Sequence, residues 1–439
     1  MKAVNVGLLG LGTVGQGVVG ILRRNANEIS RRAGREIKVT HAAVRDLSKD
    51  RSVDMQDIKL TDNVSDVVNA AEVDILVELM GGTELARTAV LEAVRNGKHV
   101  VTANKALIAI HGNEIFAAAQ KHGVIVSFEP AVAGGIPIIK AIREGLTANR
   151  INQVAGIING TGNYILTEMR DKGRSFEEAL AEAQALGYAE ADPAFDVEGT
   201  DAAHKLTILS SIAFGIPLQF DAVYTEGIAG ITAQDVDYAE ALGYRIKHLG
   251  VTRESTAGIE IRVHPTLIPE RTLLANVDGV MNAVLVQSDA VGSTLYYGPG
   301  AGSEPTGSSV VADLVDVVRT LTTDPENRVP HLAFQADLLS DKPVLPADEF
   351  VSAYYLRLQA KDRAGVMADV TRILADNAIS IESMLQKEPA AGEDEVPVVL
   401  MTHRVKEAAI NSALKRIEDL EAIVSPVCMI RVESLQAEE

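Results

Sequence analysis

Acidic residues crowd one short stretch of the sequence, residues 187–205, and end beside a lysine. Asp201 is the last of five carboxylates before Lys205. Gly199 and Thr200 can end a loop and cap a helix, so Asp201 and Lys205, four positions apart, should share one helix face. A lysine at the edge of an apolar face must be paired or must change its protonation. The spacing therefore predicts either a solvated surface pair, which is common, or part of a functional site.

The loop that precedes this helix is rich in Asp and Glu and is interrupted by Pro193. Carboxylates placed beside a core are costly unless they bind something, and a ligand with an ammonium group would suit them. The candidate substrate-binding residues of this stretch are Tyr188, Glu190, Asp196 and Asp201.

The first residues have the pattern of a dinucleotide-binding turn. The apolar run Val4–Leu9 predicts a buried parallel strand, and a helix is expected from Val14 to about Arg31. Between them stands G-x-G-x-x-G, whose glycines allow a tight turn and let backbone N–H groups approach a pyrophosphate. The candidate cofactor residues here are Gly10, Leu11, Gly12, Thr13, Val14 and Gly15. A glycine-rich turn without a ligand is the alternative.

A second strand, expected over residues 37–44, ends at Arg45 and Asp46. Dinucleotide-binding folds use an acid near this strand end to hold the ribose of NAD, whereas an arginine there favours the 2′-phosphate of NADP. Arg45 with Lys49 suggests NADP, and Asp46 keeps NAD open. A solvated arginine at a strand end is the alternative interpretation of Arg45.

Strands and helices continue to alternate up to residue 128. Further strands are expected at 73–79, 99–102 and 124–128. Five strands alternating with helices predict a doubly wound parallel sheet of α/β, Rossmann-like type, and ligands bind at the carboxyl ends of such strands. Lys105 follows one of these ends and could reach cofactor or substrate, unless it is a surface lysine at a helix start.

The segment 129–137 leaves the predicted sheet with small residues and prolines, which indicates a hinge between domains. A carboxylate and irregular backbone carbonyls can also hold a hard cation, but from the residues alone the hinge is favoured. Several strands without regular helices between them then predict an α+β domain with a mixed sheet. A glycine-rich loop, 298–306, precedes a helix near 305–321 that is expected to return to the first domain.

The last quarter of the chain reads as a separate unit. Residues 322–350 are rich in proline and predict a linker. Strand and helix patterns after it follow the order βαββαβ of a ferredoxin-like fold. The predicted boundaries are 1–130 for the nucleotide-binding domain, 131–321 for the catalytic and dimerisation domain, 322–350 for the linker and 351–439 for the final domain.

Composition excludes several classes of protein. The net charge is −19 at pH 7, which argues against binding to nucleic acid or to an anionic membrane, since both need a basic face. The one cysteine, Cys428, allows no disulfide within the chain and no cysteine metal cluster. No signal peptide is apparent, and the longest nearly apolar run, 206–218, is too short for a bilayer. A cytoplasmic protein is expected.

Together these motifs resemble homoserine dehydrogenase of the bacterial type with a C-terminal ACT domain. The resemblance covers nearly the whole chain, and residues 187–205 are its most specific part. The other motifs that carry it are the glycine turn, Thr102-Ala-Asn-Lys105-Ala, residues 129–137, Asn159-Gly-Thr-Gly-Asn-Tyr164, Tyr297–Gly302 and Asp362–Val370.

The resemblance implies reversible NAD(P)-dependent hydride transfer between L-aspartate 4-semialdehyde and L-homoserine, in the biosynthesis of threonine, methionine and isoleucine. It implies that Lys205 is the acid/base residue, that Lys105 is a second catalytic lysine, and that Glu190 and Asp201 contact homoserine. A cation beside the aldehyde oxygen would stabilise the developing alkoxide and supply its proton.

Further ligands follow from the resemblance. Gly187, Gly302 and Lys105 join the cofactor residues. A structural sodium ion is implied, held by the Glu129 side chain and by the carbonyls of Val132, Gly134 and Ile136. A phosphorylating semialdehyde dehydrogenase is excluded, because it needs a nucleophilic cysteine and Cys428 lies in the final domain. Another NAD(P)-dependent amino-acid-semialdehyde reductase and a non-catalytic amino-acid sensor remain as alternatives.

The final domain is expected to regulate the enzyme. A lone βαββαβ sheet leaves one face and two edges to be covered, which predicts pairing with its copy in a homodimer or homotetramer. The turn at Gly365 would let an amino acid's carboxylate reach a helix N-terminus, and the resemblance implies L-threonine as the effector. The alternative is a domain that only dimerises. The linker predicts that this unit is separated from the active site.

Overall fold

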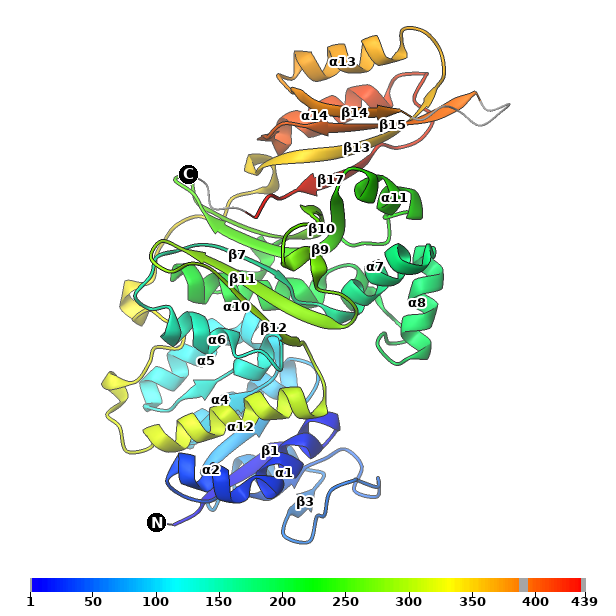
Figure 1. Cartoon of the computed structure of the whole chain (residues 1–439). Coiled ribbons are helices and arrows are strands. Elements are labelled where there is room, and N and C mark those ends of the chain that lie inside the picture. The colour runs from blue at the N-terminus through cyan, green and yellow to red at the C-terminus, as the bar shows by residue number, and fades with distance from the viewer. Residues whose placement is uncertain (1, 387–393, 436–439) are drawn as a thin grey trace. The chain divides into compact units, whose positions relative to one another are not determined.

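A computed structural model describes residues 2–386 and 394–435 (Figure 1). The chain forms two compact units, each built from several segments. The first comprises Met1–Gly160, Asp201–Val223 and Val280–Lys342, and the second Thr161–Thr200, Tyr224–Gly279 and Pro343–Glu439.

The first unit is organised around a parallel sheet. Its strand order, β3-β2-β1-β4-β5-β6, is that of a doubly wound dinucleotide-binding fold. All pairs are parallel, and the order in which successive strands are added to the sheet reverses between β1 and β4. The predicted sheet is thereby confirmed, with one strand more than expected. The strands are β1 (Val4–Leu9), β2 (Ile37–Ala43), β3 (Lys59–Thr61), β4 (Ile75–Glu78), β5 (His99–Thr102) and β6 (Val126–Ser127).

Helices cover this sheet and bury its apolar side chains. They are α1 (Thr13–Arg24), α2 (Ala26–Ala33), α3 (Val64–Val68), α4 (Glu84–Arg95), α5 (Lys105–His122) and α12 (Ser303–Thr320). The late helix α12 packs along α1 (Figure 1). The two helices approach so closely that a Cβ on Gly17 would lie 2.2 Å from the carbonyl oxygen of Ser303.

Two helix boundaries differ from the predicted ones. The helix expected from Val14 to Arg31 is divided at Asn25, whose φ of −108° and ψ of 20° interrupt the helical path. Helix α12 begins before the predicted start, because Pro305 falls in its first turn, where no N–H donor is needed.

The rest of the first unit carries a three-stranded antiparallel group and a long buried helix. β7 (Ile151–Ile157) pairs with β11 (Met281–Ser288), which pairs with β12 (Gly292–Pro299). α10 (Thr200–Phe214) is buried along almost all its length. The short helix α6 (Ile138–Lys140) follows the 129–137 segment and continues into a π-turn, Ala141–Gly145.

The second unit holds the predicted βαββαβ domain. Its order β17-β13-β15-β14 is that of a ferredoxin-like sheet, and α13 and α14 share one core with it. The elements are β13 (Val351–Lys361), α13 (Val366–Asp376), β14 (Ile381–Gln386), β15 (Glu395–Thr402), β16 (Val405–Lys406), α14 (Glu407–Glu418) and β17 (Cys428–Val432).

Preceding segments of the second unit cover the other face of that sheet. These segments are α7 (Gly160–Lys172), α8 (Phe176–Ala185), α9 (Ala194–Val197) and α11 (Ala233–Ala241), whereas β8 (Tyr224–Thr225), β9 (Tyr244–Glu254) and β10 (Ile259–Pro269) pair with one another as strands. Side chains from α7, α8 and α11 form one apolar core with Tyr355, Met401 and Ile430. The expectation that this chain leaves one face of the sheet uncovered is therefore wrong, because its own preceding segments cover that face.

The outer edge of β17 is covered as well. β17 pairs in parallel with β10, with Thr266 opposite Arg431, so the two regions form one continuous sheet within the unit. Arg431 is fully buried and donates to Glu226 at 2.7 Å and to Glu407 at 2.9 Å. The last strand is thus joined directly to an earlier strand of its unit, and β14 keeps the outer edge of the sheet.

Two strands of the second unit are short: β8 has two residues, and β17 has five, Cys428–Val432. Parts of the predicted linker form backbone hydrogen bonds with other segments. Ile259 donates to Pro343 and accepts from Leu345, and Ser340 donates to Gly215. In the described part of the chain, no helix combines the length and apolarity needed to cross a bilayer.

Candidate active site

The paired carboxylate and lysine lie inside the first unit. Asp201 stands in the first turn of α10, where a helix favours an acid, and Lys205 follows one turn later. Their exposed fractions are 3% and 8%. Lys205 Nζ lies 2.6 Å from Asp201 Oδ2 and donates to the carbonyl oxygen of Ile158 at 2.7 Å. The prediction of a solvated surface pair is therefore wrong.

A second lysine reaches the same carboxylate. Lys105 is the first residue of α5, after the carboxyl end of β5, and its Nζ lies 2.9 Å from Asp201 Oδ1. Asn159 donates from Nδ2 to Asp201 Oδ2 at 2.8 Å. One buried carboxylate thus bridges two lysines. The Lys105 side chain is 34% exposed, against 11% for that of Lys205, so solvent has more access to Lys105.

The electrostatics of the cluster keep Asp201 ionised. Burial alone would raise the pKa of its carboxyl, but the charges of Lys205 and Lys105 outweigh that effect and hold the pKa well below its ordinary value. His204 stacks on Phe220 with ring centroids 4.3 Å apart. Its burial lowers the pKa of the imidazole to about 4, so the ring is neutral near pH 7.

The glycine turn lies at the carboxyl end of the same sheet. Gly10 has a φ of +99°, and a Cβ there would lie 2.8 Å from the carbonyl oxygen of Leu79. A Cβ on Gly15 would lie 2.5 Å from the carbonyl oxygen of Gly10, whereas Gly12 has nothing within 4 Å. The turn is therefore tight where it meets the protein and open at its middle, as a bound pyrophosphate requires.

The other predicted cofactor residues of this unit lie on loops. Arg45 and Lys49 are exposed and follow β2, the strand beside β1. Gly302, the N-cap of α12, has a φ of +136° that other residues rarely adopt.

The predicted cation site is a compact bend around Glu129. This residue is 2% exposed, and its carboxylate accepts the N–H groups of Ile139 and Lys140 at 3.0 and 2.8 Å. Burial, and then the charge of Asp313, raise the pKa of Glu129 to about 7. The carbonyl of Gly134 accepts from Ser309, and that of Ile136 from the Ile138 N–H. A buried carboxylate among backbone oxygens suits a hard monovalent cation.

The remaining predicted substrate residues belong to the second unit and are described within it. Glu190 is exposed, and its backbone carbonyl accepts from Gln184 at 3.1 Å. Tyr188 is half exposed with its ring against Tyr164, and Gly187 has a φ of +75°. Asp196 lies in the single turn of α9.

Two buried polar residues were missed by the sequence analysis. Asn159 bonds directly to Asp201, whereas its Asn-Gly-Thr-Gly-Asn motif served only as part of the family resemblance and was given no role in the site. Glu78 is a lone carboxylate at the end of an otherwise apolar strand, which is the signal that could have found it. Its position at the reversal point of the sheet is visible only once the strand order is known.

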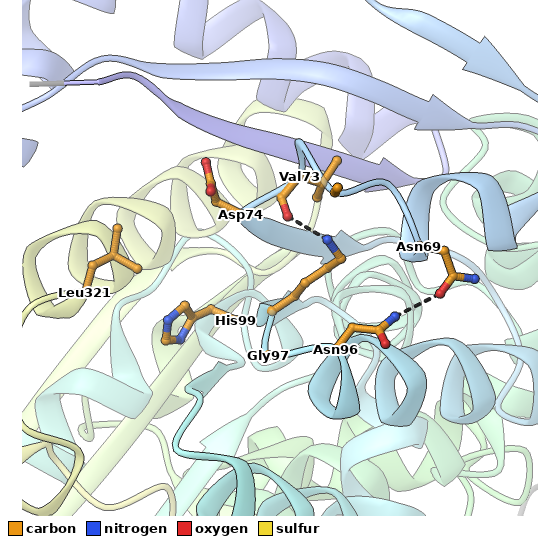
Figure 2. Close-up of a pocket in the computed structure, with 9 residues that line it drawn as sticks. Asn69, Val73, Asp74, Asn96, Gly97, His99 and Leu321 are labelled. Carbon is orange, nitrogen blue, oxygen red and sulfur yellow. Dashed lines mark hydrogen bonds between the residues drawn. The ribbon is translucent and has the colours of Figure 1, made fainter.

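A cavity of about 420 Å³ opens at the opposite end of the sheet. Figure 2 shows Val73 and Asp74 facing Gly97 and His99 there, ahead of β4 and β5. The amine of Lys98 in this cavity is bound by the carbonyls of Ala70 and Val73 at 2.6 and 2.7 Å. Because ligands of such sheets bind at the carboxyl ends of the strands, the lysine cluster is the better candidate.

Known proteins resemble the chain over its whole length. Residues 10–129 match the family described as homoserine dehydrogenase, NAD binding domain. Residues 137–315 match homoserine dehydrogenase, and residues 354–422 match the ACT domain.

Individual relatives agree with these matches. A homoserine dehydrogenase of Pseudomonas aeruginosa is 65% identical over 99% of this chain and all of its own length. The crystal structure of a homoserine dehydrogenase from Thiobacillus denitrificans is 64% identical, covers 99% of both chains and has a TM-score of 0.95. A hyperthermophilic archaeal homoserine dehydrogenase in complex with NADPH is 26% identical, with a TM-score of 0.62 over 73% of this chain and 98% of its own.

Proposed function

The chain belongs to the homoserine dehydrogenase family, and on this premise we propose that Asp201 and the two lysines bound to it are its catalytic centre. The family consists of oxidoreductases that interconvert L-homoserine and L-aspartate 4-semialdehyde. In the oxidation, the hydroxyl group of homoserine loses its proton and the carbon that bears it loses a hydride. A nicotinamide cofactor, when held at the glycine turn Gly10–Gly15, would supply the hydride acceptor for the oxidation and the hydride donor for the reduction.

The observation that carries the proposal is one buried carboxylate shared by two amines at 2.6 and 2.9 Å. In the oxidation, the Lys205 amine first releases its own proton to solvent and then takes the hydroxyl proton of homoserine; in the reduction, its ammonium form gives a proton to the aldehyde oxygen. Lys105 adds positive charge beside that oxygen, where an alkoxide develops in the transition state. Asp201, anchored by Asn159, fixes both amines and keeps them from repelling each other.

Carboxylates of residues 187–205 bind the other end of the substrate. Glu190 and Asp196, with Tyr188 and Asp201, form the recognition set for the α-ammonium group. An exposed acidic loop suits this role, because a carboxylate that is solvated before binding carries little desolvation cost until the substrate arrives.

The cofactor is NAD or NADP, in agreement with the matched NAD-binding domain. Gly10 to Gly15 receive the pyrophosphate, and the open space at Gly12 supports this. Arg45 and Lys49 bind the 2′-phosphate of NADP, and Gly187, Gly302 and Lys105 complete the set. The archaeal relative in complex with NADPH supports the preference for NADP.

A sodium ion at Glu129 is part of the proposal. Its ligands are the Glu129 carboxylate and the carbonyls of Val132, Gly134 and Ile136. An ion there would fix the bend that follows β6, where the predicted nucleotide-binding domain ends at residue 130 and the catalytic region 131–321 begins.

The ACT domain, residues 351–439 with 322–350 leading into it, binds L-threonine and inhibits the enzyme. Gly365 supports this, because its φ of +98° and the open space around it leave the N-terminus of α13 accessible to a carboxylate. The remaining outer edge, β14, pairs with its copy in a homodimer or homotetramer, and its exposed Met384 would be covered there.

Steady-state oxidation of homoserine with each cofactor tests the catalytic assignment. Lys205→Met keeps the volume of the side chain and should lower kcat about a hundredfold or more, since it removes an interaction of the transition state. Glu190→Gln should mainly raise KM for homoserine. The matched control is Lys172→Met, because Lys172 forms the same i,i+4 pair with Glu168 on α7. A normal kcat in Lys205→Met would remove Lys205 from the chemistry.

A further inference from the structure

Glu78 is buried where two strands of the parallel sheet end side by side. It is the last residue of β4, opposite Thr102, the last residue of β5. Both residues are 0% exposed. Burial raises the pKa of the Glu78 carboxyl to about 7, which means that the ionised form of this side chain is disfavoured here. None of the roles proposed above uses it.

The two carboxyl oxygens of Glu78 accept hydrogen bonds from two different segments of the chain. Oε1 accepts the backbone N–H of Met80 at 2.7 Å. The neighbouring carbonyl of Leu79 lies against Gly10, the first glycine of the cofactor turn. Oε2 accepts the hydroxyl of Thr102 at 2.6 Å. The carboxyl therefore connects the loop behind the cofactor turn with the end of β5.

From Thr102 the bonds continue into the helix that carries Lys105. Thr102 Oγ1 accepts the N–H of Asn104 at 3.0 Å. Asn104 is the N-cap of α5: its Oδ1 accepts from the Leu107 N–H at 3.0 Å, and its Nδ2 donates to the carbonyl of Gly82 at 2.8 Å. The next residue is Lys105, whose amine meets Asp201.

We infer that Glu78 is a positioning residue for the reaction: through Thr102 and Asn104 it fixes the first turn of α5 and thereby holds the amine of Lys105 at Asp201. This inference rests on the proposed role of Lys105. Glu78 touches neither lysine, so its effect is on the placement of a charge that must match the developing alkoxide. A misplacement of about 1 Å can cost about a hundredfold in rate.

Thr102 gives the cleanest test. Thr102→Val keeps the shape but removes the hydroxyl that joins Glu78 to Asn104, and Thr102→Ser restores it. Thr102→Val and Glu78→Gln should each lower kcat by about tenfold to a hundredfold. KM for homoserine and the affinity for NADPH by fluorescence titration should stay within about threefold, and Thr102→Ser should recover most of kcat.

Lys98→Met is the matched structural control. Lys98 braces the opposite ends of the same strands through one buried and one partly buried hydrogen bond, so its loss should lower Tm and leave kcat within about twofold. The comparison is made between variants that lose the same amount of Tm. If kcat then falls as much in Lys98→Met as in Thr102→Val, Glu78 only stabilises the fold, and the inference is overturned. A Thr102→Ser variant as slow as Thr102→Val overturns it too.

A double mutant separates this inference from the proposed function. In a Lys105→Ala background, Thr102→Val should cause no further loss of kcat, because the residue it positions is gone. Full additivity of the two losses would overturn the inference while leaving Lys105 in its role. A normal kcat in Lys105→Ala alone would overturn the proposed role of Lys105, and with it the inference.

Discussion

Two buried carboxylates at the ends of the first sheet meet different surroundings. Asp201 faces two lysines, which stabilise its charge. Glu129 receives two backbone N–H groups and lies close enough to Asp313 for that charge to raise its pKa further. The amine of Lys140, 3.5 Å from Asp313, offsets this effect only in part, and the remaining excess of negative charge is the residue-level reason for the sodium proposal.

The sodium site predicts an ion-specific stability. In sodium chloride the wild-type chain should melt about 2 °C or more above its Tm in choline chloride at equal ionic strength, because an ion that binds only the folded state stabilises it. Glu129→Gln should lose this difference. Equal wild-type Tm values in the two salts would leave the bend without a specific sodium ion.

Whether the role of a residue could be predicted from the sequence depends on whether its partners lie in the same element or in a distant one. The strand Val4–Leu9 and the glycine turn after it are local patterns, and both were predicted in place. Asn25 was missed as a helix break because asparagine is tolerated inside a helix as well as at its end. Asn159 and Glu78 could not be assigned, since each acts on a partner from a distant element. β17 was predicted, but its pairing with β10 is a tertiary choice that no local pattern contains.

The position of Arg45 on β2 gives an element-scale prediction. Since β2 lies beside β1, the residue that follows it is at the nucleotide end of the sheet. Arg45→Ala should raise KM for NADPH about tenfold and change KM for NADH little, because only the 2′-phosphate gains from the guanidinium. Arg35→Ala, just ahead of the same strand, is the matched control. Equal effects on both cofactors would remove Arg45 from the site.

For the molecule as a whole, the ACT sheet is part of a larger sheet in the second unit. β17 lies between β10 and β13, and Arg431 binds Glu226 on one side and Glu407 on the other. Breaking such a buried ion pair costs about 3–5 kcal/mol. A change in the ACT domain can therefore reach β10 through a bonded strand, without passing along the linker.

Threonine binding should depend on the turn at Gly365 in the full chain. Gly365→Ala places a side chain at a φ of +98° and should abolish the calorimetric signal of threonine and its inhibition, with kcat unchanged in its absence. Gly292→Ala, at a φ of +75° in the β11–β12 turn, is the control for strain alone. If wild-type chain binds no threonine in the millimolar range, the ACT domain has only a structural role.

The central claim, that the carboxylate of Asp201 organises the two lysines for catalysis, is tested most directly by kcat for homoserine oxidation in Asp201→Asn. The control is Asp278→Asn, because Asp278 likewise bridges two cations, Lys247 and Arg170, each at 3.0 Å. Both variants should lose stability. The account predicts that kcat falls by about a hundredfold or more only in Asp201→Asn, with NADPH affinity retained. A kcat within about twofold of wild type in that variant would contradict it.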